Sequence, residues 1–172
     1  MDISYSEKDR ENIAKIYERY GNLTEKQRIK AENNFKKLLD SNEAPRYIYV
    51  IRCYPYNYYK IGITNKILKR IETHQTGCPF KLIFVFAVEA DESDFLGFEI
   101  TYLEKFIHKY YKKQKKHIRG EWFHLSEDDL TSLCLFLQDN DFDILEKKDG
   151  ADELKAYHRL VHQMFLLEEG EE

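Results

Sequence analysis

The stretch YIYVIRCYPYNYYKIGIT, residues 47–64, decides the fold that we predict for the middle of this chain. Tyr47–Arg52 and Tyr58–Thr64 are rich in aromatic and β-branched side chains, which favour strands. Pro55, Tyr56 and Asn57 stand between them and supply a turn. Two strands this close in sequence pair most simply as an antiparallel hairpin, so we expect a β-hairpin here.

The segments after the hairpin alternate between helical and extended patterns. Lys81–Val88 (KLIFVFAV) is an apolar run of strand length, which we expect to be the central strand of the sheet. The other predicted elements are a helix capped at Thr64 or Asn65 and ending at Gly77, a helix over 91–113, a strand or turn over 121–125, and a helix over 126–138. This order predicts the α+β class, with a small three-stranded antiparallel sheet flanked by helices.

Both flanks of this region are predicted to be helical. Ser6 and Thr24 are expected to cap two N-terminal helices, and apolar residues recur at helical spacing over 151–167. The region between 139 and 150 is acidic and rich in turn residues, as is typical of a linker. We therefore expect an N-terminal helical extension over 1–45, a central domain over 46–138, and a linker with a C-terminal helix over 139–172.

The composition is that of a globular chain, with 42% apolar and 15% aromatic residues. The net charge of −4 does not indicate a nucleic-acid partner, but Tyr110–Arg119 (YYKKQKKHIR) is a local basic strip without an acid. Three cysteines without a CxxC pair argue against a zinc knuckle and a disulfide framework. We find no signal peptide and no apolar run that could span a bilayer, so we expect a soluble, intracellular protein without a membrane partner.

Five short motifs in a fixed order resemble those of the GIY-YIG nucleases. They are YIYV at 47–50, YKIGIT at 59–64, ILKRIETHQTG at 67–77, LEKFIH at 103–108 and RGEWFHL at 119–125. Within this superfamily the chain is most similar to the phage and viral, T5-type branch, which has a KIG variant and a terminal EWF. The resemblance implies a catalytic domain over 46–138 that acts as a metal-dependent DNA endonuclease.

The resemblance places Tyr49 and Lys60 at the attacking water. Tyr49 matches the tyrosine of the first motif, which is proposed to take the proton of the water directly or through a neighbour. Because the ordinary pKa of tyrosine is ~10, we expect neighbouring cations to lower the pKa of Tyr49 if it is the base. Lys60 stands where the second motif usually has tyrosine, and would act as a clamp on the phosphate or, if desolvated, as a base.

Arg70 and His74 are expected on one face of the helix that follows the hairpin, four residues apart. Arg70 matches the arginine of the family, and a guanidinium can bind two phosphate oxygens at once. His74 would relay a proton if neutral and bind the phosphate if charged. Without the motif, both would be interpreted as ordinary surface residues of an amphipathic helix.

Glu104 matches the glutamate that the family uses as the single protein ligand of a divalent cation, here Mg²⁺ or Mn²⁺. One carboxylate together with water and substrate phosphate is a set of ligands that Mg²⁺ prefers. The alternative is an exposed helix residue that pairs with Lys105 or His108. Tyr47 and Glu121 are expected beside the reacting groups, with Glu121 either orienting a ligand water or serving as a second carboxylate.

The basic strip is a candidate for contact with DNA phosphates, although a run of charges is often only a solvated face. Its members are Lys112, Lys113, Lys115, Lys116 and Arg119. Trp122, which follows Glu121, is expected in the core rather than as a platform for bases. RNA stays open as a substrate, and a homodimer would allow both strands to be cut.

Two alternatives remain at this point. The Lys60 replacement, and the absence of an asparagine that many relatives have near Glu121, favour a nucleic-acid-binding module of the same fold with weak or no catalysis. A structural protein whose terminal helices form an interface is the third hypothesis.

Overall fold

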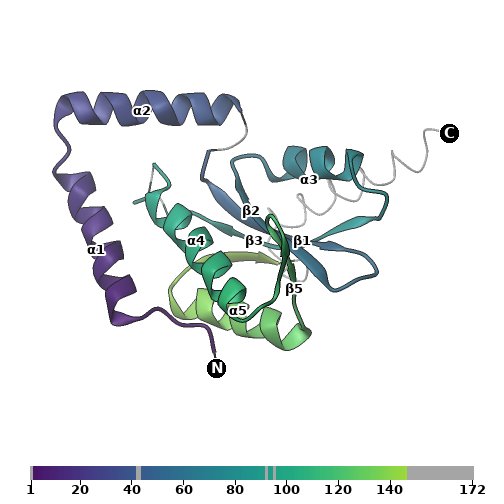
Figure 1. The fold of residues 1–172 in the computed structure, drawn as a ribbon. Helices are drawn as coiled ribbons and strands as arrows, with labels where there is room; N and C mark the ends of the chain where they lie inside the picture. Colours follow the sequence, from purple (N-terminus) through teal and green to yellow (C-terminus); the bar gives the residue numbers. More distant parts are fainter. Residues whose placement is uncertain (1, 42–43, 92, 95, 147–172) are drawn as a thin grey trace.

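A computed structural model describes residues 2–41, 44–91, 93–94 and 96–146. Within these ranges one antiparallel sheet contains six strands in the order β4-β5-β2-β1-β3-β6 (Figure 1). The strands are β1 Tyr47–Cys53, β2 Tyr58–Thr64, β3 Leu82–Glu89, β4 His117–Arg119, β5 Trp122–His124 and β6 Asp143–Glu146. The α+β class is confirmed, but the prediction of a small three-stranded sheet was wrong.

Three short strands extend the sheet beyond the three that we predicted, and one of them, β5, lies where we expected a strand or turn. β4 and β5 have three residues each, too few to show an alternating pattern, and β4 lies within the basic strip. β6 lies inside the predicted linker and is held by pairing with β3, where Ile144 faces Val88. β3 is therefore next to the edge, and β1 and β2 occupy the centre that we had assigned to it.

The predicted hairpin is confirmed. In its register Tyr49 faces Gly62 and Ile51 faces Lys60, so the side chains of each pair lie on the same face of the sheet. The guanidinium of Arg52 donates from Nε to the carbonyl of Tyr56 (2.8 Å) and from Nη2 to the carbonyl of Pro55 (3.1 Å). These bonds fix the shape of the turn.

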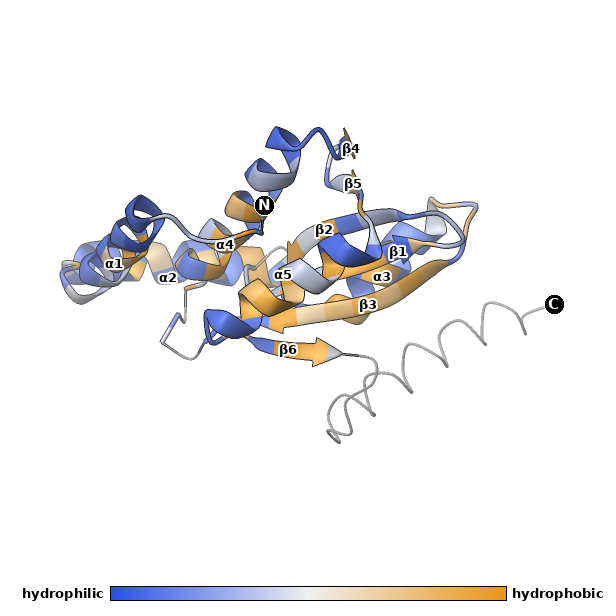
Figure 2. Ribbon diagram, turned by 90° about the horizontal axis from the view of Figure 1, so that it is seen from below, coloured by the Kyte–Doolittle hydropathy of each residue, from blue (hydrophilic) through white to orange (hydrophobic). Residues whose placement is uncertain are grey.

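Helices cover both faces of the sheet. Ile48 and Val50 of β1 pack into the larger cluster, together with α4 (Phe98–Lys113) and α5 (Glu127–Asp139). Tyr49 and Ile51 point the other way, into a cluster with α3 (Ile67–Thr76). Figure 1 shows α3 above the sheet and α5 below it, and in Figure 2 β3 and most of β6 have the colour of hydrophobic residues.

α4 begins at Phe98 rather than near Asp91, because residues before it cap it from a loop. The carboxylate of Asp94 accepts from the backbone N–H groups of Glu99 (3.0 Å) and Ile100 (2.9 Å), which have no partner in the first turn of a helix. Gly97 has φ +72° and a Cβ there would lie 2.3 Å from the carbonyl oxygen of Pro45, so only glycine fits. This anchoring positions the start of the helix that carries Glu104.

The two predicted N-terminal helices are confirmed as α1 (Glu7–Gly21) and α2 (Glu25–Asp40), and Ser6 and Thr24 each form a capping box. α1 packs on α4 through a bond from Tyr102 Oη to Asp9 (2.7 Å). The predicted C-terminal helix over 151–167 lies outside the described residues. None of the helices in the described ranges has the length and apolarity needed to cross a bilayer.

Candidate active site

The candidate site forms where β5 separates from β2. Along β2, β5 pairs with Tyr58–Lys60, and the next contact is a bond from the N–H of Ile61 to the carbonyl of Glu121 (3.0 Å). Beyond this point α4 is the neighbour of β2, because Nε2 of His108 bonds the carbonyl of Ile61 (2.7 Å). The open edge of β2 therefore brings the hairpin, Glu121 and α4 together.

Gly62 makes room for the site. A Cβ at this position would lie 2.4 Å from Oη of Tyr49 and 2.9 Å from Oε2 of Glu121, distances that real Cβ atoms do not show. The backbone of Gly62 has no positive φ, so glycine is required here for close approach rather than for conformation. The glycine of the KIG motif thus lets a phenol and a carboxylate meet over the strand.

Tyr49 and His74 form a hydrogen-bonded pair across the face covered by α3. Oη of Tyr49 lies 3.0 Å from Nε2 of His74. Burial raises the pKa of Tyr49, and the negative charge of Glu121 raises it further, whereas the positive charge of Arg70 opposes this change. Our expectation that cations would lower this pKa was therefore wrong. Burial and the charges of Lys60 and Arg70 lower the pKa of His74 to about 4. At neutral pH the bond therefore joins a neutral phenol to a neutral imidazole.

Lys60 is held between two neighbours on β5 and the segment before it. Its Nζ lies 3.3 Å from Oε2 of Glu121 and 5.7 Å from the centroid of the Trp122 ring. Trp122 is half-buried and lines a pocket, which our expectation of a simple core residue missed. The ammonium of Lys60 is thus fixed at the floor of the site.

Glu104 lies on the side of α4 that faces β2, with its side chain 13% exposed and Oε1 3.5 Å from Nε2 of His108. Burial, and secondarily Glu121, raise the pKa of Glu104 to about 7. A carbonyl only accepts hydrogen bonds, so the bond to Ile61 places the proton of His108 on Nε2, and burial lowers the pKa of this histidine. The exposed-residue alternative for Glu104 does not hold, although the pairing with His108 does.

Arg70 and Glu104 both act on the phenol of Tyr49. The positive charge of Arg70 favours ionisation of Tyr49, and the negative charge of Glu104 opposes it. Arg70 is half-buried on α3, one turn before His74, and acts on that imidazole too. Tyr47 is half-buried two residues before Tyr49 and packs on the edge of the same cluster. The predicted catalytic groups are therefore brought together around Tyr49.

The carboxylates present fit a divalent cation of the kind that takes few protein ligands. Among the described residues no group of three or more His, Cys, Asp or Glu side chains could hold a metal by itself. The pKa of Glu104 is raised first by burial and then by repulsion from the negative charge of Glu121. A cation there would offset this repulsion, and one or two carboxylates are what Mg²⁺ needs beside water and phosphate.

The residues of the basic strip have different surroundings. Lys112, Lys113 and Lys115 are exposed, whereas Lys116 forms an ion pair with Asp129 of α5. Lys112 and Lys113 line an open groove with His108, Lys105 and Lys109, and the last two were not among the lysines predicted to contact DNA. Periodicity could have indicated these two, because Lys105, Lys109 and Lys112 follow one another on α4 at spacings of four and three residues.

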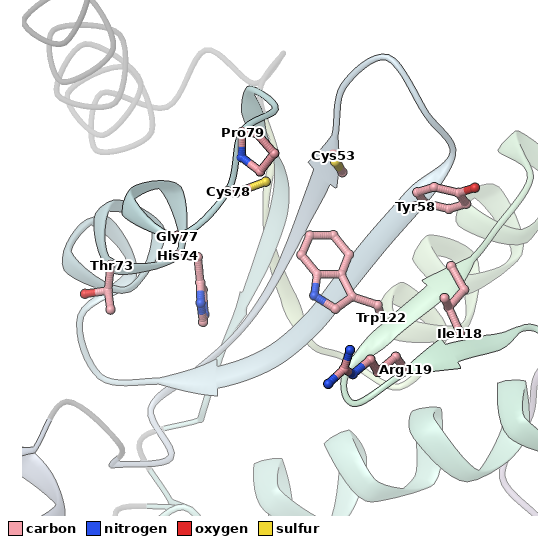
Figure 3. A pocket seen from close by; sticks show the side chains of 10 residues that line it. All are labelled: Cys53, Tyr58, Thr73, His74, Gly77, Cys78, Pro79, Ile118, Arg119 and Trp122. Atoms are coloured by element: carbon pink, nitrogen blue, oxygen red, sulfur yellow. The ribbon is translucent and has the colours of Figure 1, made fainter.

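Arg119 does not line the lysine groove. It lines a separate hollow of about 480 Å³. Figure 3 shows His74 reaching from α3 toward this hollow, with Trp122 and Arg119 opposite it. Cys53 and Tyr58, from the two strands of the hairpin, also line it. The hollow therefore joins the Tyr49–His74 pair to the solvent.

Residues 46–138 match the family model of the T5orf172 domain. This is a phage-related domain associated with nuclease folds of the GIY-YIG and HNH kind. Comparison with curated proteins gave no match. Comparison with solved structures gave none either.

Proposed function

This chain belongs to the T5orf172 domain family, and on that premise we propose that it is a metal-dependent DNA endonuclease with a GIY-YIG-like site. The observation that carries the proposal is the Tyr49–His74 hydrogen bond in reach of the charges of Arg70, Lys60 and Glu104. A phenol, an imidazole, two cations and a buried carboxylate around one point are the groups that hydrolysis of a phosphodiester requires.

The proton of the attacking water passes along the Tyr49–His74 pair. As the water oxygen bonds to phosphorus, its proton moves to Oη of Tyr49, and the phenolic proton moves to Nε2 of His74. Tyr49 thus stays neutral, which its raised pKa favours. His74 lines the hollow and can release the proton to solvent. The bond from phosphorus to the 3′ oxygen breaks, and this oxygen leaves with the electron pair.

The cations of the site bind the phosphate. Arg70 can bind two non-bridging oxygens of the phosphate, and the ammonium of Lys60 adds a positive point charge from β2. Glu104, with Glu121 beside it, would hold Mg²⁺ or Mn²⁺. When bound, the ion would neutralise charge that develops on the phosphate and on the leaving oxygen. The 3.3 Å contact of Lys60 with Glu121 restrains the second carboxylate beside this ammonium.

Nicking of supercoiled plasmid DNA with Mg²⁺ or Mn²⁺ tests the proposal. Wild-type protein should convert supercoiled to nicked circles, and Glu104→Gln should abolish this conversion because it removes the ligand charge but keeps the shape. Glu72→Gln is the matched control, since Glu72 is an exposed glutamate of α3. Its rate should equal that of wild type.

Three other outcomes would contradict the endonuclease. DNA binding without nicking would support the binding module, and neither binding nor nicking would support a structural protein. Nicking that Glu104→Gln leaves unchanged would show that the cutting does not come from this site. The same assay on a single-stranded RNA would decide whether RNA is also a substrate.

A further inference from the structure

Three aromatic rings stand exposed beside the candidate site. Tyr56, Tyr58 and Phe80 are 42%, 41% and 43% exposed. The rings of Tyr56 and Tyr58 stack with centroids 5.4 Å apart, and Phe80 meets Tyr56 edge to face at 5.2 Å. We call these three residues the aromatic platform. Large exposed rings in contact with one another are unusual on a protein surface and indicate a binding site.

The platform is held rigidly. The guanidinium of Arg52 bonds the carbonyls of Pro55 and Tyr56, and the carbonyl of Asn57 accepts from the N–H of Leu125 (3.2 Å). The ring of Tyr58 also packs edge-on against His124 of β5, with centroids 5.8 Å apart. A partner that binds here does not have to order the turn first, which reduces the entropic cost of binding.

The platform is continuous with the proposed phosphate site. Tyr58, Lys60 and Gly62 alternate with inward residues along β2, so they lie on the same face of the sheet. Tyr58 is therefore roughly 14 Å from Gly62 along the strand, at ~3.4 Å per residue. The hollow reaches from Tyr58 to His74, the hydrogen-bond partner of Tyr49, and Trp122 and Arg119 also line it. A chain of nucleotides bound at the phosphate site would extend along this path.

We infer that the aromatic platform stacks unpaired bases of a single-stranded DNA segment next to the scissile phosphate; this rests on the proposed function. Stacking on aromatic rings beside a cation is how proteins bind single strands without reading the sequence. Bases within a duplex are stacked on each other, so their faces are not accessible to Tyr56 and Tyr58. The surface offers rings and the guanidinium of Arg119, with Ile118 and Pro79 as exposed aliphatic side chains of the hollow, which favours bases over a protein partner.

Binding of fluorescent oligonucleotides in EDTA, where a metal-dependent enzyme cannot cut, tests this inference. Wild-type protein should bind a 12-nucleotide single strand at least tenfold more tightly than a duplex of the same length. The double variant Tyr56→Ala/Tyr58→Ala should lose roughly 10- to 100-fold in affinity for the single strand, as expected for loss of base–aromatic stacking. Tyr58→Phe should bind like wild type, because it keeps the ring.

Phe98→Ala is the matched control, because Phe98 has an equally exposed ring (42%) that lies on α4 against Tyr20, away from the platform. Its affinity should be that of wild type. Equal affinities for single strand and duplex, or an unchanged affinity in the double variant, would overturn the inference. Thermal unfolding of each variant identifies any that fails to fold, and in that case Tyr58→Leu, which keeps bulk without a ring, decides.

The binding assay and the nicking assay fail independently. Nicking by wild type together with no preference for the single strand would contradict base stacking on the aromatic platform and support the endonuclease. A preference for the single strand that depends on the aromatic platform, without nicking, would support base stacking and contradict the proposed hydrolysis. No binding to either DNA together with no nicking would contradict both proposals.

Discussion

A Cβ placed on Gly62 would lie 2.4 Å from Oη of Tyr49. The phenol ring of Tyr49 is buried, with 1% exposure, so it cannot move aside without disturbing its neighbours. This relationship links the glycine of one strand to the proposed proton relay on the next.

We predict that Gly62→Ala damages both stability and activity. The added methyl group must displace Tyr49 or Glu121, and overpacking of this kind costs about 1–3 kcal/mol of unfolding free energy. Nicking should fall at least tenfold, because Tyr49 moves away from His74. Gly77→Ala is the control, since a Cβ there meets nothing within 4 Å. Equal nicking by Gly62→Ala and wild type would show that the close approach is not needed.

The stability of Glu104→Gln should depend on pH. Burial raises the pKa of Glu104 from 4.5 to about 7, so the folded protein binds a proton that the unfolded chain releases between these values. The stabilising effect of that proton is complete below pH 4.5 and is lost as the pH rises through 7. Above pH 7 wild type carries a buried charge, and Glu104→Gln should be more stable by about 1–3 kcal/mol, at about 1.4 kcal/mol per pKa unit. Urea unfolding at pH 8 and pH 5, without metal, measures this difference, which should be smaller at pH 5.

The pH dependence of nicking should shift with the concentration of Mg²⁺. Glu104 must lose its proton to hold a cation, so nicking should rise as the pH passes through about 7. Mg²⁺ and the proton compete for the same carboxylate, and tenfold more Mg²⁺ should therefore move the midpoint to lower pH. Rates measured from pH 5.5 to 8.5 at two Mg²⁺ concentrations test this. A midpoint that does not move would argue against Glu104 as a ligand.

Two residues of the basic strip should differ in their effect on DNA binding. Arg119 is exposed at the rim of the hollow, whereas Lys116 is engaged with Asp129. Arg119→Met should weaken binding and reduce the slope of log affinity against log salt by about one, as expected for one lost phosphate contact. Lys116→Met should leave that slope unchanged. Equal effects would mean that the strip binds as a diffuse charge.

The sequence was sufficient for the features that depend on local pattern. The hairpin follows from two strand-like runs around a turn, and the caps at Ser6 and Thr24 follow from their side chains. The features that we missed depend on tertiary contacts. β6 is a strand only because it pairs with β3, and α4 starts at Phe98 only because Asp94 folds back over its first turn.

The candidate site divides in the same way. Motif positions predicted Tyr49 and Glu104, but nothing local showed that burial raises the pKa of both groups. His108 was considered only as an ion-pair partner, although its bond to Ile61 holds α4 on β2. The role of Gly62 could have been derived, because a hairpin that pairs Cys53 with Tyr58 also pairs Tyr49 with Gly62.

The most direct test of the central claim is the nicking rate of Tyr49→Phe, which removes one oxygen atom and keeps the ring. Tyr59→Phe is the control, because it removes a hydroxyl from a buried tyrosine on the opposite face of β2. If the water proton passes through Tyr49 to His74, Tyr49→Phe should lose 10²-fold or more in rate, as is typical of a lost proton-transfer group, and Tyr59→Phe should stay within about threefold of wild type. A Tyr49→Phe variant that nicks DNA as fast as wild type would contradict the account.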